Sequence, residues 1–163
     1  LRANMNFVLP KDQPSVILVS SNTSGEGKTF CSINLASVYS LAGKKTLIIG
    51  TDLRKPKIAK EFGLSNDKGL SNYLSGQQDD WKQLIKGTAY EHLDILLSGP
   101  IPPNPAELIG NGKMSKLMEE LRGAYDIIIL DTPPIGMVSE TLEMFPLADA
   151  VFFVVSYNYT LKS

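Results

Sequence analysis

The residues best suited to chemistry in this chain are 20–29, which read SSNTSGEGKT. Gly25 and Gly27 have no Cβ, so the backbone can curl and approach an anion closely. A helix that begins near Lys28 would direct its free N–H groups, and the positive end of its dipole, at the same anion. Lys28 would then reach the terminal phosphates and the Thr29 hydroxyl would bind Mg²⁺. The stretch therefore predicts a phosphate-binding loop.

Asn22 stands where the strict loop pattern, G-x-x-x-x-G-K-[ST], has its first glycine. The context still fits, because the apolar run 16–19 precedes the loop and a helix-like segment follows it. The alternative is a solvent loop that happens to contain Gly-Lys-Thr. We expect ATP and Mg²⁺ as cofactors, with nucleotide contacts from Thr23, Ser24, Gly25, Glu26, Gly27, Lys28, Thr29 and Phe30.

Two carboxylates follow apolar runs farther along the chain. Asp131 comes directly after residues 126–130, and Asp52 comes shortly after residues 46–50. An acidic residue in such a place is costly to bury unless a cation or hydrogen-bond donors accompany it. Asp131 fits a carboxylate that binds Mg²⁺ directly or through water, although Asp-Thr-Pro-Pro also reads as a turn.

Arg54 follows Asp52 closely and can pair with a phosphate or with an acidic partner surface, whereas for Lys55 we prefer ordinary solvated charge. Two sets of residues are therefore expected at this site. The metal ligands would be Thr29, Asp52 and Asp131, and the catalytic set would be Lys28, Asp52, Arg54 and Asp131.

Apolar, β-branched-rich runs alternate with helix-like stretches along the whole chain. The predicted strands are 16–20, 46–50, 126–130 and 150–156, with a weaker fifth at 92–97. The predicted helices are 28–41, 70–74, 79–85, 105–109, 113–122 and 141–145. Strands that are apolar throughout suit a sheet covered on both faces, and the alternation predicts an α/β fold with a parallel, doubly wound sheet and flanking helices. Ligands of such sheets bind at the carboxyl ends of the strands.

Bulk composition excludes several classes of protein. The 163 residues suit one domain, and a net charge of −1 favours neither nucleic acid nor a membrane surface as a partner. A single cysteine excludes an internal disulfide and a zinc site built of cysteines, and the expected compartment is a reducing cytoplasm. We find no signal peptide and no apolar run long enough to span a bilayer, so we expect a soluble chain, whether it stands alone or is cut from a longer membrane protein.

At these motifs the chain resembles the cytoplasmic kinase domain of bacterial tyrosine kinases, a family that drives capsule and exopolysaccharide assembly. The family's Walker A, S-S-x-x-x-G-E-G-K-[ST], matches residues 20–29, and its Walker B, three apolar residues then D-x-x-P, matches residues 128–134. Its Walker A′, D-x-D-x-R, matches at Asp52 and Arg54. Its P-P-N-P-x-E-L-[LI] segment matches residues 102–109.

The resemblance implies an autophosphorylating, ATP-dependent protein tyrosine kinase with the fold of the P-loop NTPases. It implies ATP and ADP as ligands, and protein tyrosines as substrates, including the C-terminal tail of the longer protein. It also implies an oligomer, a membrane-embedded polysaccharide co-polymerase as part of the chain or as a partner, and a place at the inner face of the cell membrane. No nucleic acid is expected.

Residues 1–163 then correspond to a single kinase domain that is truncated at both ends relative to the family. Residues 1–7 look like the end of the family's E-x-x-R-x-x-R oligomerisation helix, with Arg2 as its last arginine. Tyr157 and Tyr159 look structural and unlike the family's tyrosine cluster.

One departure bears on activity, because Gly50 occupies the first Asp position of Walker A′ and leaves Asp52 as the remaining candidate base. An ATP-binding assembly switch with little kinase activity is therefore an alternative. A second alternative is a septum-site or plasmid-partition ATPase, whose loop reads K-G-G-x-G-K-[ST]. Thr23 stands at the position of that signature lysine, and Glu26 and residues 102–109 favour the kinases.

Overall fold

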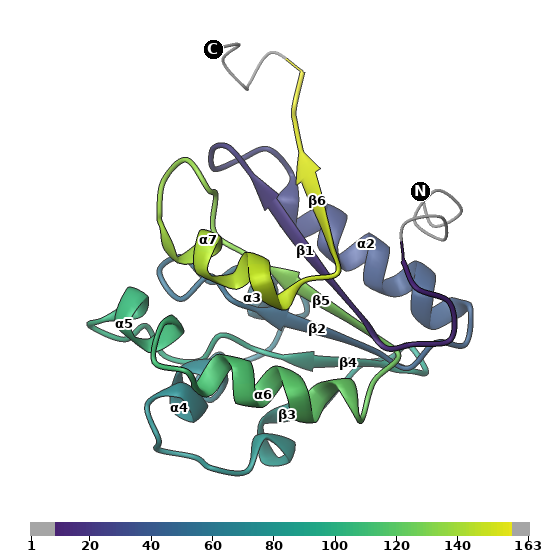
Figure 1. The fold of residues 1–163 in the computed structure, drawn as a ribbon, viewed down its shortest axis with the longest axis horizontal. Helices are drawn as coiled ribbons and strands as arrows, with labels where there is room; N and C mark the ends of the chain where they lie inside the picture. The colour runs from purple at the N-terminus through teal and green to yellow at the C-terminus, as the bar shows by residue number, and fades with distance from the viewer. Residues whose placement is uncertain (1–8, 158–163) are drawn as a thin grey trace.

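The computed structural model describes residues 9–157, in which strands and helices alternate (Figure 1). The strands are β1 (Ser15–Ser21), β2 (Thr46–Gly50), β3 (Ile85–Gly87), β4 (Leu93–Leu96), β5 (Ile127–Asp131) and β6 (Ala150–Val154). The α-helices are α2 (Lys28–Leu41), α3 (Ile58–Glu61), α4 (Leu70–Leu74), α5 (Pro105–Ile109), α6 (Lys113–Arg122) and α7 (Glu140–Met144). Two 3₁₀ turns are η1 (Trp81–Leu84) and η2 (Phe145–Leu147).

The six strands form one sheet in the order β3-β4-β2-β5-β1-β6. All neighbouring strands pair in parallel except β3 and β4, which are antiparallel. Strand β5 lies between β1 and β2, so the three strands that end at the predicted functional residues are adjacent. Their carboxyl ends therefore meet at one edge of the sheet.

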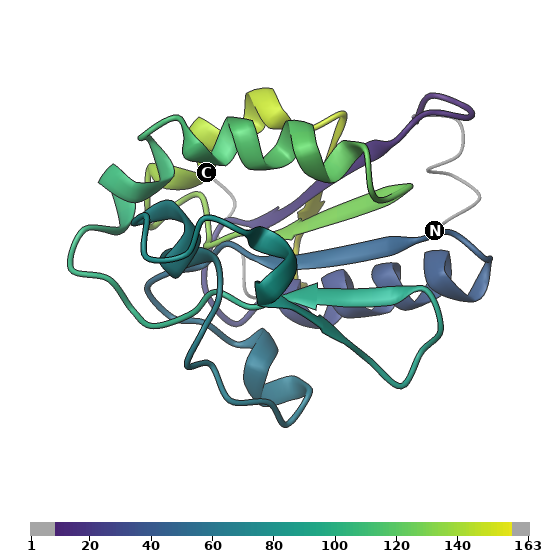
Figure 2. The same cartoon turned by 90° about the horizontal axis from the view of Figure 1, so that it is seen from below.

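Helices cover both faces of the sheet, and successive strand residues point to opposite faces. Val16 and Leu18 of β1 are buried in a core with residues of α4, α6 and α7, whereas Ile17 and Val19 are buried in a second core with residues of α2 and α3. Figure 2 shows α2 and α6 on opposite sides of the sheet. This two-sided burial explains why the strands are apolar throughout instead of alternating.

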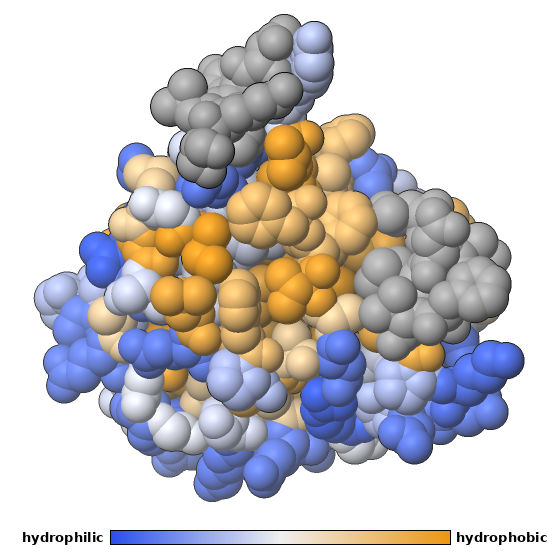
Figure 3. Space-filling model, turned by 45° about the horizontal axis from the view of Figure 1, so that its top comes forward, coloured by the Kyte–Doolittle hydropathy of each residue, from blue (hydrophilic) through white to orange (hydrophobic). Residues whose placement is uncertain are grey.

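Strand β6 differs from this pattern because it forms an edge of the sheet. Ala150 and Val154 are buried, but Val151 and Phe153 are exposed, so only one face of the strand is covered by the described residues. Figure 3 shows apolar side chains gathered on this side of the molecule. The sequence predicted that the strand within residues 150–156 is covered on both faces. Within the part of the chain that the structure describes, one face of β6 is exposed, so this prediction is wrong.

The predicted fold class, an α/β fold with a parallel, doubly wound sheet and flanking helices, is confirmed. Sequence reasoning missed the four-residue helix α3 and the short antiparallel strand β3. The predicted helix 79–85 is instead the 3₁₀ turn η1, and Ile85 begins β3. Residues 1–7 and Tyr159 lie outside the described residues. Within residues 9–157, every helix is too short or too polar to cross a lipid bilayer.

Candidate functional site

The predicted functional residues meet at the carboxyl ends of β1, β5 and β2. Asp131, the last residue of β5, pairs in register with Val19 of β1 on one side and with Gly50 of β2 on the other. The phosphate loop follows β1, and Asp52 lies two residues beyond the end of β2. The sheet order thus brings Asp131 beside Thr29, which lies 102 positions earlier in the sequence.

The backbone of the predicted phosphate loop turns at two glycines and leads directly into α2. Gly25 and Gly27 have φ angles of 84° and 83°, in the left-handed region that favours glycine. Gly27 is the residue before the first turn of α2, and its carbonyl accepts the N–H of Cys31 at 3.0 Å. The remaining N–H groups at the start of α2 are therefore available to an anion at the loop.

Asp131 is buried at 3 % exposure and is surrounded by donors. Its Oδ2 accepts the Thr29 hydroxyl at 2.9 Å, and its Oδ1 accepts the Ser32 hydroxyl at 2.9 Å. The Lys28 ammonium lies 3.5 Å from Oδ1. Burial raises the pKa of the Asp131 carboxyl above its ordinary value, and Lys28, Ser32 and Thr29 act in the opposite direction.

Ser32 was not predicted from the sequence. It lies on α2 one turn after Lys28 and is completely buried. Its hydroxyl is within hydrogen-bond distance of the Lys28 carbonyl (3.0 Å) as well as of Asp131. The i, i+4 spacing from the loop lysine was the one signal in the sequence, since it places both residues on the same face of a helix.

Asp52 caps the loop that follows β2. Its Oδ1 accepts the N–H of Arg54 at 3.1 Å and the N–H of Lys55 at 2.9 Å, and the residue is only 8 % exposed. This local turn fixes the carboxylate and occupies one of its two oxygens. The second oxygen has no hydrogen bond to any other residue that the structure describes.

The Arg54 side chain pairs with Glu140, the first residue of α7, which sequence reasoning missed. Arg54 Nε lies 2.8 Å and Nη2 lies 2.7 Å from Glu140 Oε1. The Glu140 side chain is 5 % exposed and the Arg54 side chain 47 % exposed. Of the two predicted partners of Arg54, a phosphate or an acidic surface, the structure shows a carboxylate of the same chain.

Glu26 shapes the phosphate loop from inside. Its Oε2 accepts the N–H groups of Asn22 at 2.9 Å and Thr23 at 3.0 Å, and the residue is 6 % exposed. Within residues 9–157, its Oε1 is buried without a hydrogen-bond partner. The carboxylate therefore holds the start of the loop, at the position where the strict pattern has its first glycine.

A pocket of about 300 Å³ opens between the phosphate loop, the loop after β2 and the segment after β5. Asp131 lies behind Lys28 and Thr29 and does not line it; neither do Thr23 and Glu26. The other predicted residues line the pocket. Two lysines and several apolar side chains of the segment after β5 complete the lining. The lining residues are Ser24, Gly25, Gly27, Lys28, Thr29, Phe30, Asp52, Arg54, Lys55, Lys57, Glu61, Pro133, Pro134, Met137 and Val138.

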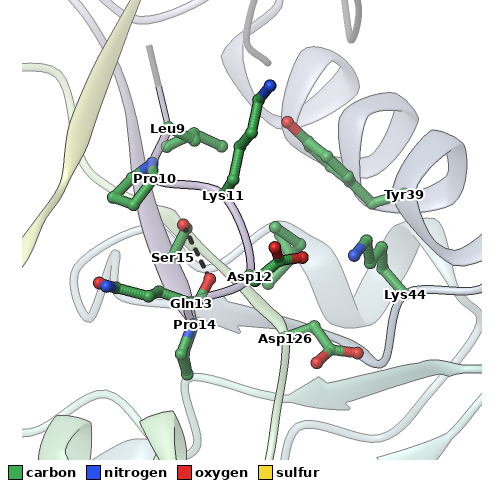
Figure 4. A pocket seen from close by; sticks show the side chains of 11 residues that line it. Leu9, Pro10, Lys11, Asp12, Gln13, Pro14, Ser15, Tyr39, Lys44 and Asp126 are labelled. Atoms are coloured by element: carbon green, nitrogen blue, oxygen red, sulfur yellow. Dashed lines mark hydrogen bonds between the residues drawn. The ribbon is translucent and has the colours of Figure 1, made fainter. Parts of the chain in front are cut away.

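A larger pocket, of about 570 Å³, lies at the opposite ends of the strands (Figure 4). It is lined by residues 9–15 together with Tyr39, Lys44, Asp126 and Ile127, and it contains none of the predicted functional residues. In a parallel sheet this is the amino end of the strands, where ligand sites are not expected.

Comparison with known proteins agrees with this arrangement. Residues 14–162 match the family described as AAA domain. The chain is 40% identical over 162 residues to the tyrosine-protein kinase YwqD of Bacillus subtilis, covering 99% of this chain and 68% of that protein. It is 41% identical over 140 residues to the putative tyrosine-protein kinase CapB of Staphylococcus aureus, covering 86% of this chain and 61% of that protein.

Solved structures give the same result. The kinase domain of the Escherichia coli tyrosine kinase ETK superposes with a TM-score of 0.93 at 30% identity, covering 98% of this chain and 62% of that one. The septum-site protein MinD of Pyrococcus horikoshii, with a TM-score of 0.74 at 23% identity over 87% of this chain and 58% of that one, shares the fold. The chain therefore belongs to the AAA domain family and to the family of the bacterial tyrosine-protein kinases.

Proposed function

We propose that this chain transfers the γ-phosphoryl group of ATP to protein tyrosines, and that it thereby regulates exopolysaccharide or capsule polymerisation and export. The observation that supports this best is the cluster of Lys28, Thr29 and Asp131 at the end of a phosphate-binding loop. In phosphoryl transfer the protein mostly positions the reactants and neutralises charge, and this cluster contains the groups for both tasks.

The residues at the loop fit a nucleotide with Mg²⁺. Thr29 Oγ1 and Asp131 Oδ2 are 2.9 Å apart. A hydroxyl and a carboxylate oxygen are the kind of ligand that Mg²⁺ prefers. Thr29, with Asp131 and Asp52 directly or through water, would hold the ion, which neutralises charge that develops on the phosphates. Lys28 would contact the terminal phosphates once it leaves Asp131.

The pocket also has features that suit an aromatic acceptor. Phe30, Pro134, Met137 and Val138 form an apolar part of its lining, which phosphates do not need. Asp52 lines the same pocket with one carboxylate oxygen not engaged by the loop amides. A tyrosine hydroxyl titrates at about 10, so a carboxylate that accepts its proton would assist the attack, typically by about 10²–10⁴-fold.

Lys55 and Lys57 line the pocket as well, and within residues 9–157 no carboxylate lies within ion-pair distance of either ammonium. We therefore expect tyrosines flanked by acidic residues to be preferred as acceptors. An acceptor peptide with Asp flanking residues should have a lower KM than the same peptide with Lys in their place.

The environment of the protein is also part of the proposal. We infer that it lies at the inner face of a bacterial membrane, attached to a polysaccharide co-polymerase by the same chain or as a partner. There it forms an oligomer in which tyrosines of the C-terminal tail of one longer chain reach the pocket of another. The resemblance in sequence motifs supports these inferences.

The second candidate function is an ATP-binding assembly switch, and Gly50 favours it. A Cβ built on Gly50 would lie 2.6 Å from Ser98 Oγ and 3.3 Å from Ser98 N, so the local packing is adapted to a residue without a side chain. Gly50 also lacks the carboxylate that the family has at this position. If the chain is a kinase, we therefore expect it to be a slow one.

Phosphate transfer from labelled ATP to a tyrosine peptide tests the proposal, with the 163-residue chain as enzyme and its Lys28→Ala variant as control. We expect slow, Mg²⁺-dependent phosphotyrosine formation that the variant lacks. Binding of ATP by the parent without any phosphotyrosine, either on the peptide or on the longer natural protein, would favour the assembly switch. Equal ATP affinity of parent and variant in calorimetry would refute the nucleotide site itself.

A further inference from the structure

An ion pair joins the two sides of the pocket. Arg54 belongs to the loop after β2, and Glu140 begins α7, 86 residues later in the sequence. Two guanidinium nitrogens lie within 2.8 Å of the same carboxylate oxygen. This is the distance of a charge-assisted hydrogen bond, which is about twice as strong as a neutral one.

The pair is unequal in its exposure to solvent. The Glu140 side chain is 5 % exposed, whereas nearly half of the Arg54 side chain is exposed. A buried carboxylate is costly unless it is paired, and within residues 9–157 Arg54 is the one cation within 4 Å of Glu140. Glu140 therefore constrains where the Arg54 guanidinium can lie.

Arg54 in turn is connected to Asp52. The backbone N–H of Arg54 donates to Asp52 Oδ1 at 3.1 Å, next to the bond from Lys55. A displacement of Arg54 would thus move a donor that orients the Asp52 carboxylate. Glu140, Arg54 and Asp52 form a continuous chain of contacts that ends at a pocket-lining acid.

The other end of this chain is anchored to the segment that follows Asp131. Thr141, next to Glu140, donates its hydroxyl to the Pro133 carbonyl at 2.8 Å. Pro133, Pro134 and Met137 line the pocket opposite the loop after β2. The ion pair therefore connects both walls of the pocket.

We propose that Glu140 is a positioning residue for phosphoryl transfer. Through Arg54 it holds the loop after β2, and with it Asp52, at a fixed distance from the segment that follows Asp131. This role rests on the proposed kinase function, but the fixed Asp52 carboxylate also matters for Mg²⁺-dependent binding of ATP, whether or not transfer follows.

Glu140→Gln tests the role, because it keeps the size of the side chain and removes its charge. Partners that orient a metal ligand typically contribute about 10–100-fold to metal affinity or activity. We expect about a tenfold lower kcat for peptide phosphorylation. Mg²⁺ increases the affinity for ATP, and we expect this increase to be about tenfold smaller in Glu140→Gln. ATP affinity without metal should stay within about twofold, since Lys28 and the phosphate loop are untouched. The control is Glu143→Gln, an exposed acid on the same helix, which should match the parent.

A purely structural role is separated by a double substitution. Arg54→Met leaves Glu140 buried and unpaired, so it should lower the melting temperature more than Glu140→Gln does. Arg54→Met combined with Glu140→Leu should recover the melting temperature without recovering the Mg²⁺-dependent gain in ATP affinity. If Glu140→Gln keeps that gain, or if the double variant regains it together with stability, the positioning role is wrong. The two proposals can fail separately. If the parent chain shows no kinase activity, but Glu140→Gln still reduces the increase in ATP affinity that Mg²⁺ provides, the kinase function is refuted and the positioning of Asp52 by Glu140 stands.

Discussion

Removing the Ser32 hydroxyl should show how far this donor offsets the cost of burying the charged form of Asp131. A serine hydroxyl has one proton, and the Ser32 oxygen lies 3.0 Å from the Lys28 carbonyl and 2.9 Å from Asp131 Oδ1. The charged acceptor forms the stronger bond, so Ser32→Ala mainly removes a donor from a buried carboxylate. Lys28 at 3.5 Å would then be the remaining donor to Oδ1 among the described residues.

The loss of stability expected for Ser32→Ala depends on the charge of the group that accepts the hydrogen bond, the Asp131 carboxylate. A hydrogen bond to a charged group contributes about 1.5–3 kcal/mol to stability. For a protein of this size 1 kcal/mol shifts the melting temperature by about 2–4 °C, so Ser32→Ala should lower it by about 3–12 °C at a pH at which Asp131 is ionised. The matched control is Ser40→Ala, because Ser40 is also buried on α2 but donates to a backbone carbonyl, Ser37 O, at 3.1 Å. The gain in helix propensity from Ser to Ala is the same in both variants.

The stability difference between Ser32→Ala and the parent should depend on pH, in a direction that follows from the pKa of Asp131. The folded-state pKa of Asp131 is raised by burial, so the stability linked to this group is present below its unfolded pKa and is lost as pH rises through the folded pKa. Ser32→Ala raises that pKa further, because the Ser32 bond lowers it. The difference between Ser32→Ala and parent should therefore be small in acid, grow as pH rises through the titration of Asp131, and then level off.

Thermal unfolding followed by circular dichroism from pH 4 to pH 9, without nucleotide, measures this difference directly. If Ser32→Ala and Ser40→Ala lose the same stability at every pH, the Ser32 hydroxyl does not support an ionised Asp131. A loss for Ser32→Ala that is independent of pH would show that packing, and not charge, sets the cost.

Three further substitutions test other parts of the site. Asp131→Asn should reduce Mg²⁺-dependent ATP binding by about tenfold or more while metal-free binding changes little, and equal losses in calorimetry would exclude Asp131 as a metal ligand. Gly50→Asp alone should lower the melting temperature, because its Cβ meets Ser98 Oγ at 2.6 Å; combined with Ser98→Ala it should be better tolerated and should raise phosphotyrosine formation above that of Ser98→Ala. No gain in a folded double variant would show that a second carboxylate is not limiting. Glu26→Gln retains an oxygen for the two loop amides and should bind ATP like the parent, whereas Glu26→Ala should bind more weakly; a normal affinity of Glu26→Ala would contradict the role of this side chain in shaping the loop.

The parts of the fold that local sequence determines were predictable. Gly27 and Gly43, both with positive φ, flank α2 at its start and end, and its bounds agree with the expected helix. The burial of Asp131 among donors follows from an acid at the end of an apolar run, since such an acid needs partners. The bounds of α2 and the burial of Asp131 depend mainly on residues that are close in the sequence, so the spacing of residue types along the chain is enough to predict them.

Contacts between distant segments were not predictable in the same way. The partner of Arg54 depends on where α7 begins relative to β2, and nothing near either residue indicates that distance. Ser32 resembles any other helix serine until the sheet order places β5 beside β1. Strand β3 has three residues and pairs only at the edge of the sheet, so it leaves little pattern in the sequence. The place of the candidate residues at the strand ends was therefore predictable, whereas Ser32 and Glu140, which contact them, became visible only in the structure.

The strengths of the contacts around Asp131 indicate which of them a nucleotide can replace. Lys28 lies 3.5 Å from the carboxylate, longer than the about 2.7–2.9 Å of a strong charge-assisted bond, so its transfer to a phosphate costs little. The Thr29 bond is short, at 2.9 Å, but Mg²⁺ held by Thr29, with Asp131 directly or through water, would supply stronger interactions in its place. Ser32 alone can keep its bond throughout, because its hydroxyl lies behind the pocket and is fully buried. Asp131 would thus retain one fixed donor at every stage of nucleotide binding, and a buried carboxylate would at no stage lack a partner.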